Sequence, residues 1–414
     1  MNRRLSPGWT LFIFTGLNLF NYLDRYVLSA VLPPLADHFK LNGEQSGRTS
    51  TVFMIGYFVT APIFGYLGDR VSRKWLVAAG IFVWSLGTVL TGFAGSYGAL
   101  LAYRVLVGVG EASYATIGPG MLSDTFGPAR RNNALTIFYV AIPVGAALGY
   151  MFGGFMADHY SWRDAFLWSG VPGFALALVL LPFQEPKRGA ADSAAGGDAA
   201  PAKTGVGEIL GFFRNTRYML VVWGYVAYTF AMGAFAFWGP AFLEQAHGLS
   251  TAKAAGFFGA VTVFSGLVGT MAGGFAATAW QKRNPAGYAW VLALSVLPAV
   301  PIAFLALWVN DTNLSMAFLA LAIFLLFLST GPVNTLILDA CPVNLRSSAM
   351  ALSIFMIHLF GDMWSPQIVG ALKDKWHSLQ QAALILPVAL LVCGVLWLIL
   401  AFRDRKTASI QLPR

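Results

Sequence analysis

Twelve long apolar runs constrain the fold of this chain more than any other feature. A helix needs about 20 apolar residues to cross the hydrocarbon core of a bilayer, and every run is long enough. The runs do not alternate apolar and polar residues, as the strands of a membrane barrel do. They begin near Trp9, Thr49, Trp75, Tyr97, Asn133, Trp162, Tyr218, Ala254, Ala286, Asn313, Ser348 and Gln380. Only 11% of the residues are charged, against about 25% in soluble domains, so we predict an all-α membrane protein with twelve transmembrane helices.

The distribution of basic residues predicts the topology. The net charge is +9, and positive residues concentrate on the inner side of membrane proteins. With a cytoplasmic N-terminus, most of the 27 Lys and Arg fall in inner segments. The outer loops then hold Lys40, Arg48, Arg163, Lys253, Lys373 and Lys375. We therefore expect both termini on the cytoplasmic side of a cell membrane, the inner membrane of a bacterium, and no binding of nucleic acid.

A stretch of different composition divides the chain. After Glu185 the sequence becomes "PKRGAADSAAGGDAAPAKTGVGEILGFFRNTR". Such an Ala/Gly-rich, charged stretch is typical of a flexible linker. We expect an N-terminal six-helix bundle at 1–185, a cytoplasmic linker at 186–217, and a C-terminal six-helix bundle with a cytoplasmic tail at 218–414.

The two halves repeat one another around two inner loops. The segment "GYLGDRVSRKWL" corresponds to "GFAATAWQKRNP", which pairs Gly65 with Gly274. The segment "DTFGPARRNNA" corresponds to "DACPVNLRSSA", which pairs Asp124 with Asp339. Internal repeats of this kind are typical of secondary transporters.

Five charged residues lie inside the apolar runs, namely Asp24, Arg25, Arg104, Glu111 and Asp362. A charge at the centre of a membrane helix costs about 2.5–3.5 kcal/mol. Together they would cost as much as the whole stability of a typical protein, about 5–15 kcal/mol. We therefore expect them to be paired, hydrated or protonated for part of a working cycle.

Helix geometry limits how these charges can pair. Arg104 and Glu111 are two turns apart and share one face of their helix, whereas Asp24 and Arg25 point about 100° apart. Our hypothesis is that Asp24 binds and releases a proton, with Glu111 as the second candidate. Protonation of Asp24 would free Arg25 to meet an anionic head group. The alternative is a static salt-bridge cluster that fixes helix packing.

Two inner loops suggest a conformational gate. In "GYLGDRVSRKWL" we expect Gly65 to allow close helix packing, and the charged side chains to form a network that holds one state closed. The gate residues we propose are Gly65, Asp69, Arg70, Arg73, Lys74, Asp124 and Arg131. The alternative is an ordinary basic inner loop. Elsewhere, Gly145, Gly149 and Gly153 recur at four-residue spacing, which predicts a surface for close helix packing.

The second half offers weaker candidates. His358 and Asp362 are four residues apart on one helix face. The pair could relay protons, contact a head group, or fix the helix near a break at Pro366. Further candidates for the lining of a substrate cavity are Tyr225, Tyr228, Trp238 and Asn334.

Several segments resemble a known family. "GYLGDRVSRKWL" resembles the signature loop of the major facilitator superfamily. The segments "NYLDRYVLSAVLPPLADHF", "RVLVGVGEASYATIGPGMLSDTF" and "HLFGDMWSPQIVGAL" resemble its spinster family. The resemblance implies two six-helix bundles around a central cavity that the first and fourth helices line. It also implies transport by alternating access of an amphiphile such as a lysophospholipid or sphingosine phosphate.

The function we predict is therefore proton-coupled transport of a lipid-like substrate by a monomer in the bilayer. A drug/proton antiporter or an organic-anion symporter of the same superfamily is the alternative. A membrane-embedded lipid enzyme is more remote, because we find no nucleophile with a base and no metal-ligand spacing. We expect no cofactor and no metal.

Overall fold

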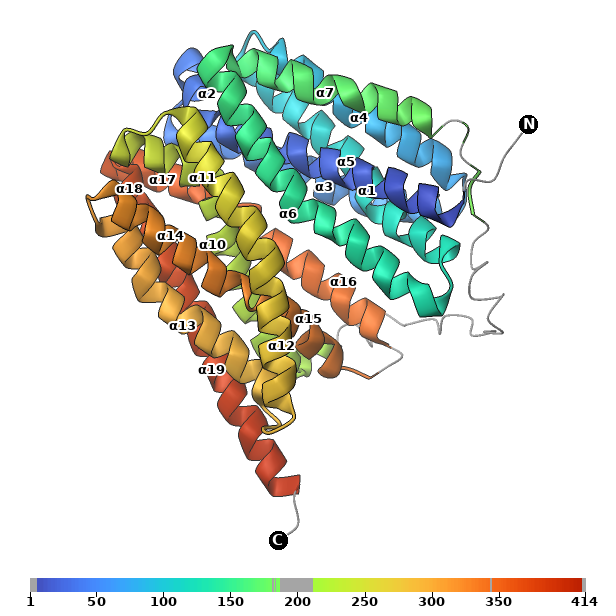
Figure 1. The fold of residues 1–414 in the computed structure, drawn as a ribbon, viewed down its shortest axis with the longest axis vertical. Coiled ribbons are helices and arrows are strands. Elements are labelled where there is room, and N and C mark those ends of the chain that lie inside the picture. The colour runs from blue at the N-terminus through green and yellow to red at the C-terminus, as the bar shows by residue number, and fades with distance from the viewer. Residues whose placement is uncertain (1–5, 181, 183, 187–210, 343–344, 412–414) are drawn as a thin grey trace. The chain divides into compact units, whose positions relative to one another are not determined.

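The computed structural model describes residues 6–411 except 181, 183, 187–210 and 343–344. The regular structure of these residues is helical (Figure 1). The chain divides into two compact units, which comprise 1–200 with 249–260 and 201–248 with 261–414. Most of the predicted linker at 186–217 lies outside the described residues.

The first half of the chain contains seven described helices. They are α1 (Pro7–Ala30), α2 (Leu32–Phe39), α3 (Gly43–Gly68), α4 (Arg73–Gly92), α5 (Tyr97–Thr125), α6 (Pro128–His159) and α7 (Trp162–Val179). Helix α1 stops at Val31 because Pro33 and Pro34 follow at the start of α2, and proline has no backbone N–H to donate. α1 and α2 together form the first predicted span.

The second half is more often interrupted. Its helices are η1 (Phe212–Arg214), α10 (Thr216–His247), α11 (Thr251–Phe264), α12 (Thr270–Gln281), α13 (Gly287–Trp308), α14 (Thr312–Phe327), α15 (Thr330–Asp339), α16 (Arg346–Ile357), α17 (Ser365–Trp376), α18 (Leu379–Ala383) and α19 (Ile385–Gln411). Single π-helical turns, η2 (Ser265–Gly269) and η4 (His358–Asp362), join α11 to α12 and α16 to α17. Turns of this kind often mark functional positions.

Length and hydropathy single out eight of the described helical segments as apolar enough to cross a membrane by that measure alone. Helices α1, α5 and α7 and the α16–α17 segment fall outside these eight. The five intramembrane charges predicted from the sequence lie on α1, α5 and the α16–α17 segment, whereas α7 carries none of them.

Glycines allow the helices of the first unit to pack closely. The main pairings are α1 with α6, α3 with α5, and α4 with α5 (Figure 1). A Cβ at Gly149 would lie 2.4 Å from the Leu23 carbonyl oxygen, and Gly145 has the same relation to Leu19. The predicted packing role of these α6 glycines is confirmed. Gly65 differs, because a Cβ there would meet only a Thr116 methyl group at 3.7 Å, an ordinary contact. The prediction of tight packing at Gly65 is therefore wrong.

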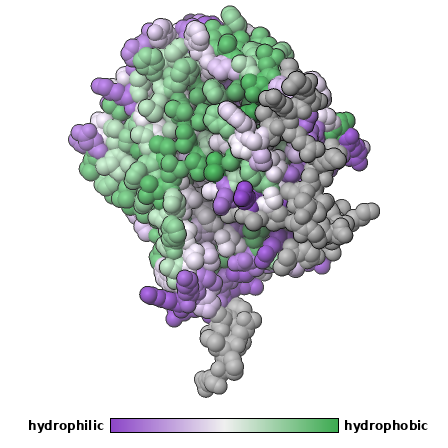
Figure 2. Space-filling view, turned by 45° about the vertical axis from the view of Figure 1, so that its right-hand side comes forward, coloured by the Kyte–Doolittle hydropathy of each residue, from purple (hydrophilic) through white to green (hydrophobic). Residues whose placement is uncertain are grey.

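Large apolar side chains remain exposed on the surfaces of both units. Phe275 is 72% exposed and Val59 60% exposed. The face in Figure 2 is largely hydrophobic over its middle, with hydrophilic side chains gathered towards its ends. A soluble monomer rarely exposes such large apolar patches, whereas a bilayer covers them.

Candidate functional site

A buried ion pair joins α1 to α5 in the first unit. Arg25 donates from Nη2 to Glu111 Oε2 at 2.7 Å and from Nε to the same oxygen at 3.2 Å. The Glu111 side chain is fully buried, whereas that of Arg25 is 23% exposed. One end of this ion pair is thus enclosed in the unit, and the other is accessible.

Aromatic rings frame the accessible guanidinium. The Arg25 Cζ atom lies 4.9 Å from the ring centre of Tyr22, 5.0 Å from that of Phe53 and 5.5 Å from that of Tyr57. Phe53 and Tyr57 are one turn apart on α3, and Tyr22 precedes Arg25 by almost one turn of α1. Cation–π attraction favours a charged guanidinium in this position. The site therefore combines one cation with a broad aromatic surface.

Asp24 faces a different part of the unit. It is only 2% exposed and lies near Ser169 of α7, Thr88 of α4 and Arg104. Consecutive helical residues point about 100° apart, which places Asp24 and Arg25 against different neighbours. The carboxylate that pairs with Arg25 is Glu111.

Arg104 completes the cluster on α5. It is 2% exposed, and its guanidinium lies 4.9 Å from the Phe53 ring centre. Phe53 thus contacts both arginines of the site. Within the described residues, Asp24 Oδ1, Glu111 Oε1 and Arg104 Nε have no hydrogen-bond partner of ordinary geometry. Buried polar atoms without a partner are rare in proteins, and functional sites are one of the places where they occur.

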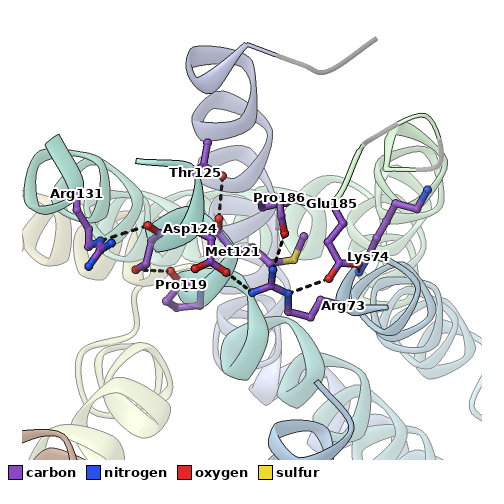
Figure 3. A network of polar contacts seen from close by, with 10 residues as sticks. Arg73, Lys74, Pro119, Met121, Asp124, Thr125, Arg131, Glu185 and Pro186 are labelled. Atoms are coloured by element: carbon purple, nitrogen blue, oxygen red, sulfur yellow. Dashed lines mark hydrogen bonds and ion pairs between the residues drawn. The ribbon is translucent and has the colours of Figure 1, made fainter. Parts of the chain in front are cut away.

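A second polar network lies at the loop between α3 and α4 (Figure 3). Arg73 joins two acids, with 2.5 Å from Nη1 to Asp124 Oδ2 and 2.9 Å from Nε to Glu185 Oε1. It also donates from Nη2 to the Pro186 carbonyl oxygen at 2.8 Å. One arginine thus ties the start of α4 to the end of α5 and to the chain that follows α7.

Glu185 is the residue of this network that the sequence analysis missed. It accepts from Ser72 Oγ at 2.7 Å and from the Lys74 backbone N–H at 3.4 Å. Burial acts to raise the pKa of Glu185, but the hydrogen bonds from Ser72, Arg73 and the backbone outweigh it and hold the pKa below its ordinary value. Its signal was present in the segment "LPFQEPKRG", where an acid directly precedes a proline and two bases.

The other predicted gate residues take different contacts. Asp69 ends α3, and Arg70 donates to the Tyr66 carbonyl oxygen at 3.2 Å while it lies over the Tyr66 ring. Lys74 reaches Glu185 through its backbone, as described above. Arg131 donates to the Ser123 carbonyl oxygen at 3.2 Å (Figure 3). The predicted network is thus centred on Arg73, Asp124 and Glu185.

The second unit contains the predicted histidine pair. His358 Nδ1 lies 2.9 Å and 3.1 Å from the two carboxylate oxygens of Asp362, and the two residues bound the π-helical turn η4. Helix α10 approaches this turn closely, because a Cβ at Gly361 would meet Thr229 Oγ1 at 2.3 Å. The pair is half-buried, and Tyr225 of α10 lies near Asp362.

Two of the predicted cavity aromatics pack inside the second unit. Tyr228 is buried and donates its hydroxyl to the Leu326 carbonyl oxygen at 3.0 Å. Trp238 is buried and donates its indole N–H to the Pro366 carbonyl oxygen at 2.8 Å. Asn334 bonds within its own helix, to the Thr330 carbonyl oxygen. These contacts fix helices to one another and leave Tyr225 as the more accessible aromatic candidate.

In the part of the chain that the structure describes, no cluster of three or more His, Cys, Asp or Glu side chains is arranged to hold a metal ion. The residues that sequence reasoning missed around Arg25 are Tyr22, Phe53 and Tyr57. Their signal was weak, because aromatic residues are common in membrane helices and only the fold brings the Phe53 and Tyr57 rings of α3 to the Arg25 guanidinium.

Comparison with known proteins identifies the family to which this chain belongs. The sequence profile of the Major Facilitator Superfamily matches residues 14–366. Protein spinster of Drosophila melanogaster is 34% identical over 380 residues, which cover 89% of this chain and 62% of that protein. Human protein spinster homolog 1 is 34% identical over 398 residues, which cover 90% of this chain and 74% of that protein.

Solved structures share the fold. A bacterial homolog of the human lysosomal transporter spinster, in an inward-facing and occupied conformation, superposes with a TM-score of 0.85 at 21% identity, covering 96% of this chain and 98% of that one. A nucleoside transporter superposes with a TM-score of 0.69 at 12% identity, covering 95% and 98%. This fold has twelve transmembrane helices. The chain belongs to the spinster family of the major facilitator superfamily, and it is a multi-pass membrane transporter of a small molecule.

Proposed function

We propose that this transporter carries an amphiphile with an anionic head group and one long tail, of the lysophospholipid or sphingosine-phosphate type. The observation that carries the proposal is the Arg25 guanidinium, which is partly exposed beside three aromatic rings. A guanidinium binds phosphate through charge-assisted hydrogen bonds. Aromatic surfaces next to it suit the apolar part of the same molecule. The sequence resemblance to the spinster family implies the same class of substrate.

The partner of Arg25 supports a proposal of proton coupling. While Glu111 is ionised, it satisfies the charge of Arg25, and a phosphate must compete with it. When Glu111 takes up a proton, the attraction is lost and the guanidinium is released for the head group. A fully buried carboxylate is costly without its counter-charge, which links the two events. Glu111 therefore replaces Asp24 as our first candidate for the proton site.

Transport by alternating access requires contacts that break and reform, and we assign this role to the Arg73 network. Its ion pairs join the ends of α4, α5 and α7 in one state of the cycle. A change of state would separate Arg73 from Asp124 or Glu185. We place both termini on the cytoplasmic side of a cell membrane, since that topology puts this basic loop inside.

The test is flux in proteoliposomes that contain the full chain, with and without a pH gradient. The two probes are a lysophospholipid and gluconate, a small organic anion without a tail. We expect the pH gradient to accelerate lysophospholipid flux only. Arg25→Gln should reduce that flux by about 10- to 100-fold, because it removes a charged hydrogen-bond donor worth about 1.5–3 kcal/mol.

Arg48→Gln is the matched control, since Arg48 is an exposed arginine paired with Glu44 on the surface. Its flux should equal that of the unaltered chain. Movement of gluconate alone would refute the proposal of an amphiphilic substrate and would favour an organic-anion symporter. Equal flux in Arg25→Gln and Arg48→Gln would remove Arg25 from the substrate site.

A further inference from the structure

A groove of about 570 Å³ opens on the surface of the second unit, and none of its lining residues belongs to the proposed transport site. One wall is a face of α10 that includes Leu220, Trp223 and Ala227, and the other is a face of α19 that includes Val388 and Val392. Every residue that lines it is apolar except Thr216, at one end. Its outer rim is accessible, with Val388 57% and Val392 50% exposed.

The floor of the groove is fixed by a close contact between its two helices. A Cβ at Gly224 would lie 2.2 Å from Trp397 Nε1, and this indole donates to the Val221 carbonyl oxygen at 3.2 Å. The two helices therefore contact each other at Gly224 and Trp397, beneath the groove. Small side chains, Ala227 and Ala389, line the space between them. The hollow is thus built into the packing.

The π-helical turn η4 contributes one residue to the border of the groove. Phe360 lies in this turn, lines the groove and is 50% exposed. Its ring centre is 5.5 Å from that of Trp223. The two rings extend the apolar wall outward and deepen the groove.

The length of the groove matches a lipid chain. Its residues on α10 run from Thr216 to Phe230, a rise of about 21 Å along a helix. One leaflet contributes about half of the roughly 30 Å hydrocarbon core of a bilayer. The groove can therefore hold a fully extended acyl chain of one leaflet along most of its length.

The end of the groove at Thr216 is basic. Arg214 is exposed just before α10, and Arg217 follows Thr216 in the sequence. Arg217 pairs with Asp404 of α19 at 2.9 Å, so both walls of the groove end here. The segment around Asp404 also carries Arg403, Arg405 and Lys406. Basic side chains at a membrane surface attract anionic lipids.

We propose that this groove is a binding site for an anionic phospholipid of the surrounding bilayer. One acyl chain lies between α10 and α19, and the phosphate lies at Arg214 and Arg217. The apolar lining, the length and the basic end all fit this one occupant. Neither Arg25 nor Glu111 lines the groove, and the groove holds a resident lipid rather than transported cargo.

The experiment uses the purified full chain in detergent, with dioleoyl-phosphatidylglycerol or dioleoyl-phosphatidylcholine added. Native mass spectrometry counts the bound lipids, and a thermal melt gives the Tm. We expect one retained phosphatidylglycerol and a Tm about 5 °C higher than with phosphatidylcholine, since a ligand of the folded state raises Tm. Val392→Trp fills the groove and should abolish both effects. Val395→Trp adds the same bulk to an exposed position of α19 outside the groove and should keep them.

Arg214→Gln should reduce the preference for phosphatidylglycerol and leave the fold intact, because Arg214 is an exposed side chain. Equal binding of the two lipids to the unaltered chain would refute the proposed preference for an anionic head group. Equal behaviour of Val392→Trp and Val395→Trp would overturn the groove as the site. A dimer that Val392→Trp disrupts would show a second copy of the chain as the occupant and overturn the lipid. None of these outcomes depends on transport.

Discussion

Replacing Gly108 by alanine should destabilise the first unit and disturb its charged site together. Gly108 lies on α5 between Arg104 and Glu111, against α3. A Cβ at this position would lie 2.1 Å from the Phe53 carbonyl oxygen and 2.9 Å from the Tyr57 backbone nitrogen. Ordinary contacts of a Cβ begin at about 3.4 Å, so α3 must move by more than 1 Å. The obstacle is backbone, which cannot turn aside as a flexible side chain can.

The magnitude follows from two opposing terms. Overpacking by one methyl group costs about 1–3 kcal/mol, and contact with backbone places Gly108→Ala at the upper end. Alanine in place of glycine inside a helix contributes about 1 kcal/mol of stability. We therefore expect a net loss of about 1–2 kcal/mol. Because the Phe53 ring lies against Arg25 and Arg104, lysophospholipid flux should also fall.

Gly120→Ala is the control for this prediction. Gly120 lies on the same helix, and a Cβ there would meet nothing within 4 Å. It should gain up to about 1 kcal/mol and keep its flux. Thermal melts should separate the two variants by about 5 °C or more, since 1 kcal/mol corresponds to about 2–4 °C in a unit of this size. Equal Tm values would refute the packing of α3 against α5 described above.

Three further predictions concern other contacts. Arg73→Gln should lower the unfolding free energy by about 3 kcal/mol, because it leaves Asp124 and Glu185 without their buried cation, and denaturant titration measures this loss. The pKa of Glu185 lies below its ordinary value of 4.5, so its contribution to stability is complete above that pH and is lost as the pH falls through the folded-state pKa. Melts at pH 7 and pH 3.5 should therefore differ less in Glu185→Gln than in the unaltered chain, and an unchanged difference would contradict the hydrogen bonds assigned to Glu185. Tyr228→Phe should lower the unfolding free energy by about 1 kcal/mol, because it removes the hydrogen bond to Leu326, and flux should be retained. Lost flux at an unchanged Tm would instead indicate that Tyr228 contacts the substrate.

The sequence predicted the helices well because length and hydropathy are properties of each segment alone. It also identified the charged residues that membrane burial makes exceptional. The sequence could not predict how these charges pair. Helix periodicity gives the direction of Asp24 relative to Arg25, but it does not say which neighbouring helix each side chain faces. The fold supplies this missing information by packing α1 against α5 and α7.

The same reason explains other contacts that the sequence could not predict. Tyr228 and Trp238 were candidates for the lining of a cavity, and the fold shows that both donate to carbonyl oxygens on neighbouring helices. Gly65 looked like a packing position, but the nearest side chain of α5 lies at an ordinary distance. Glu185 joined the Arg73 network across more than a hundred residues of sequence. Such contacts depend on tertiary packing, which no local pattern contains.

The claim at the centre of this account is that protonation of Glu111 releases Arg25 for an anionic head group. The direct measurement is lysophospholipid flux in proteoliposomes at several pH gradients, for Glu111→Gln and Asp24→Asn side by side. Both residues are buried carboxylic acids of one cluster, but only Glu111 bonds to Arg25. We predict that Glu111→Gln still exchanges substrate yet loses its response to the gradient, while Asp24→Asn keeps that response. A gradient response that survives in Glu111→Gln and disappears in Asp24→Asn would contradict the account.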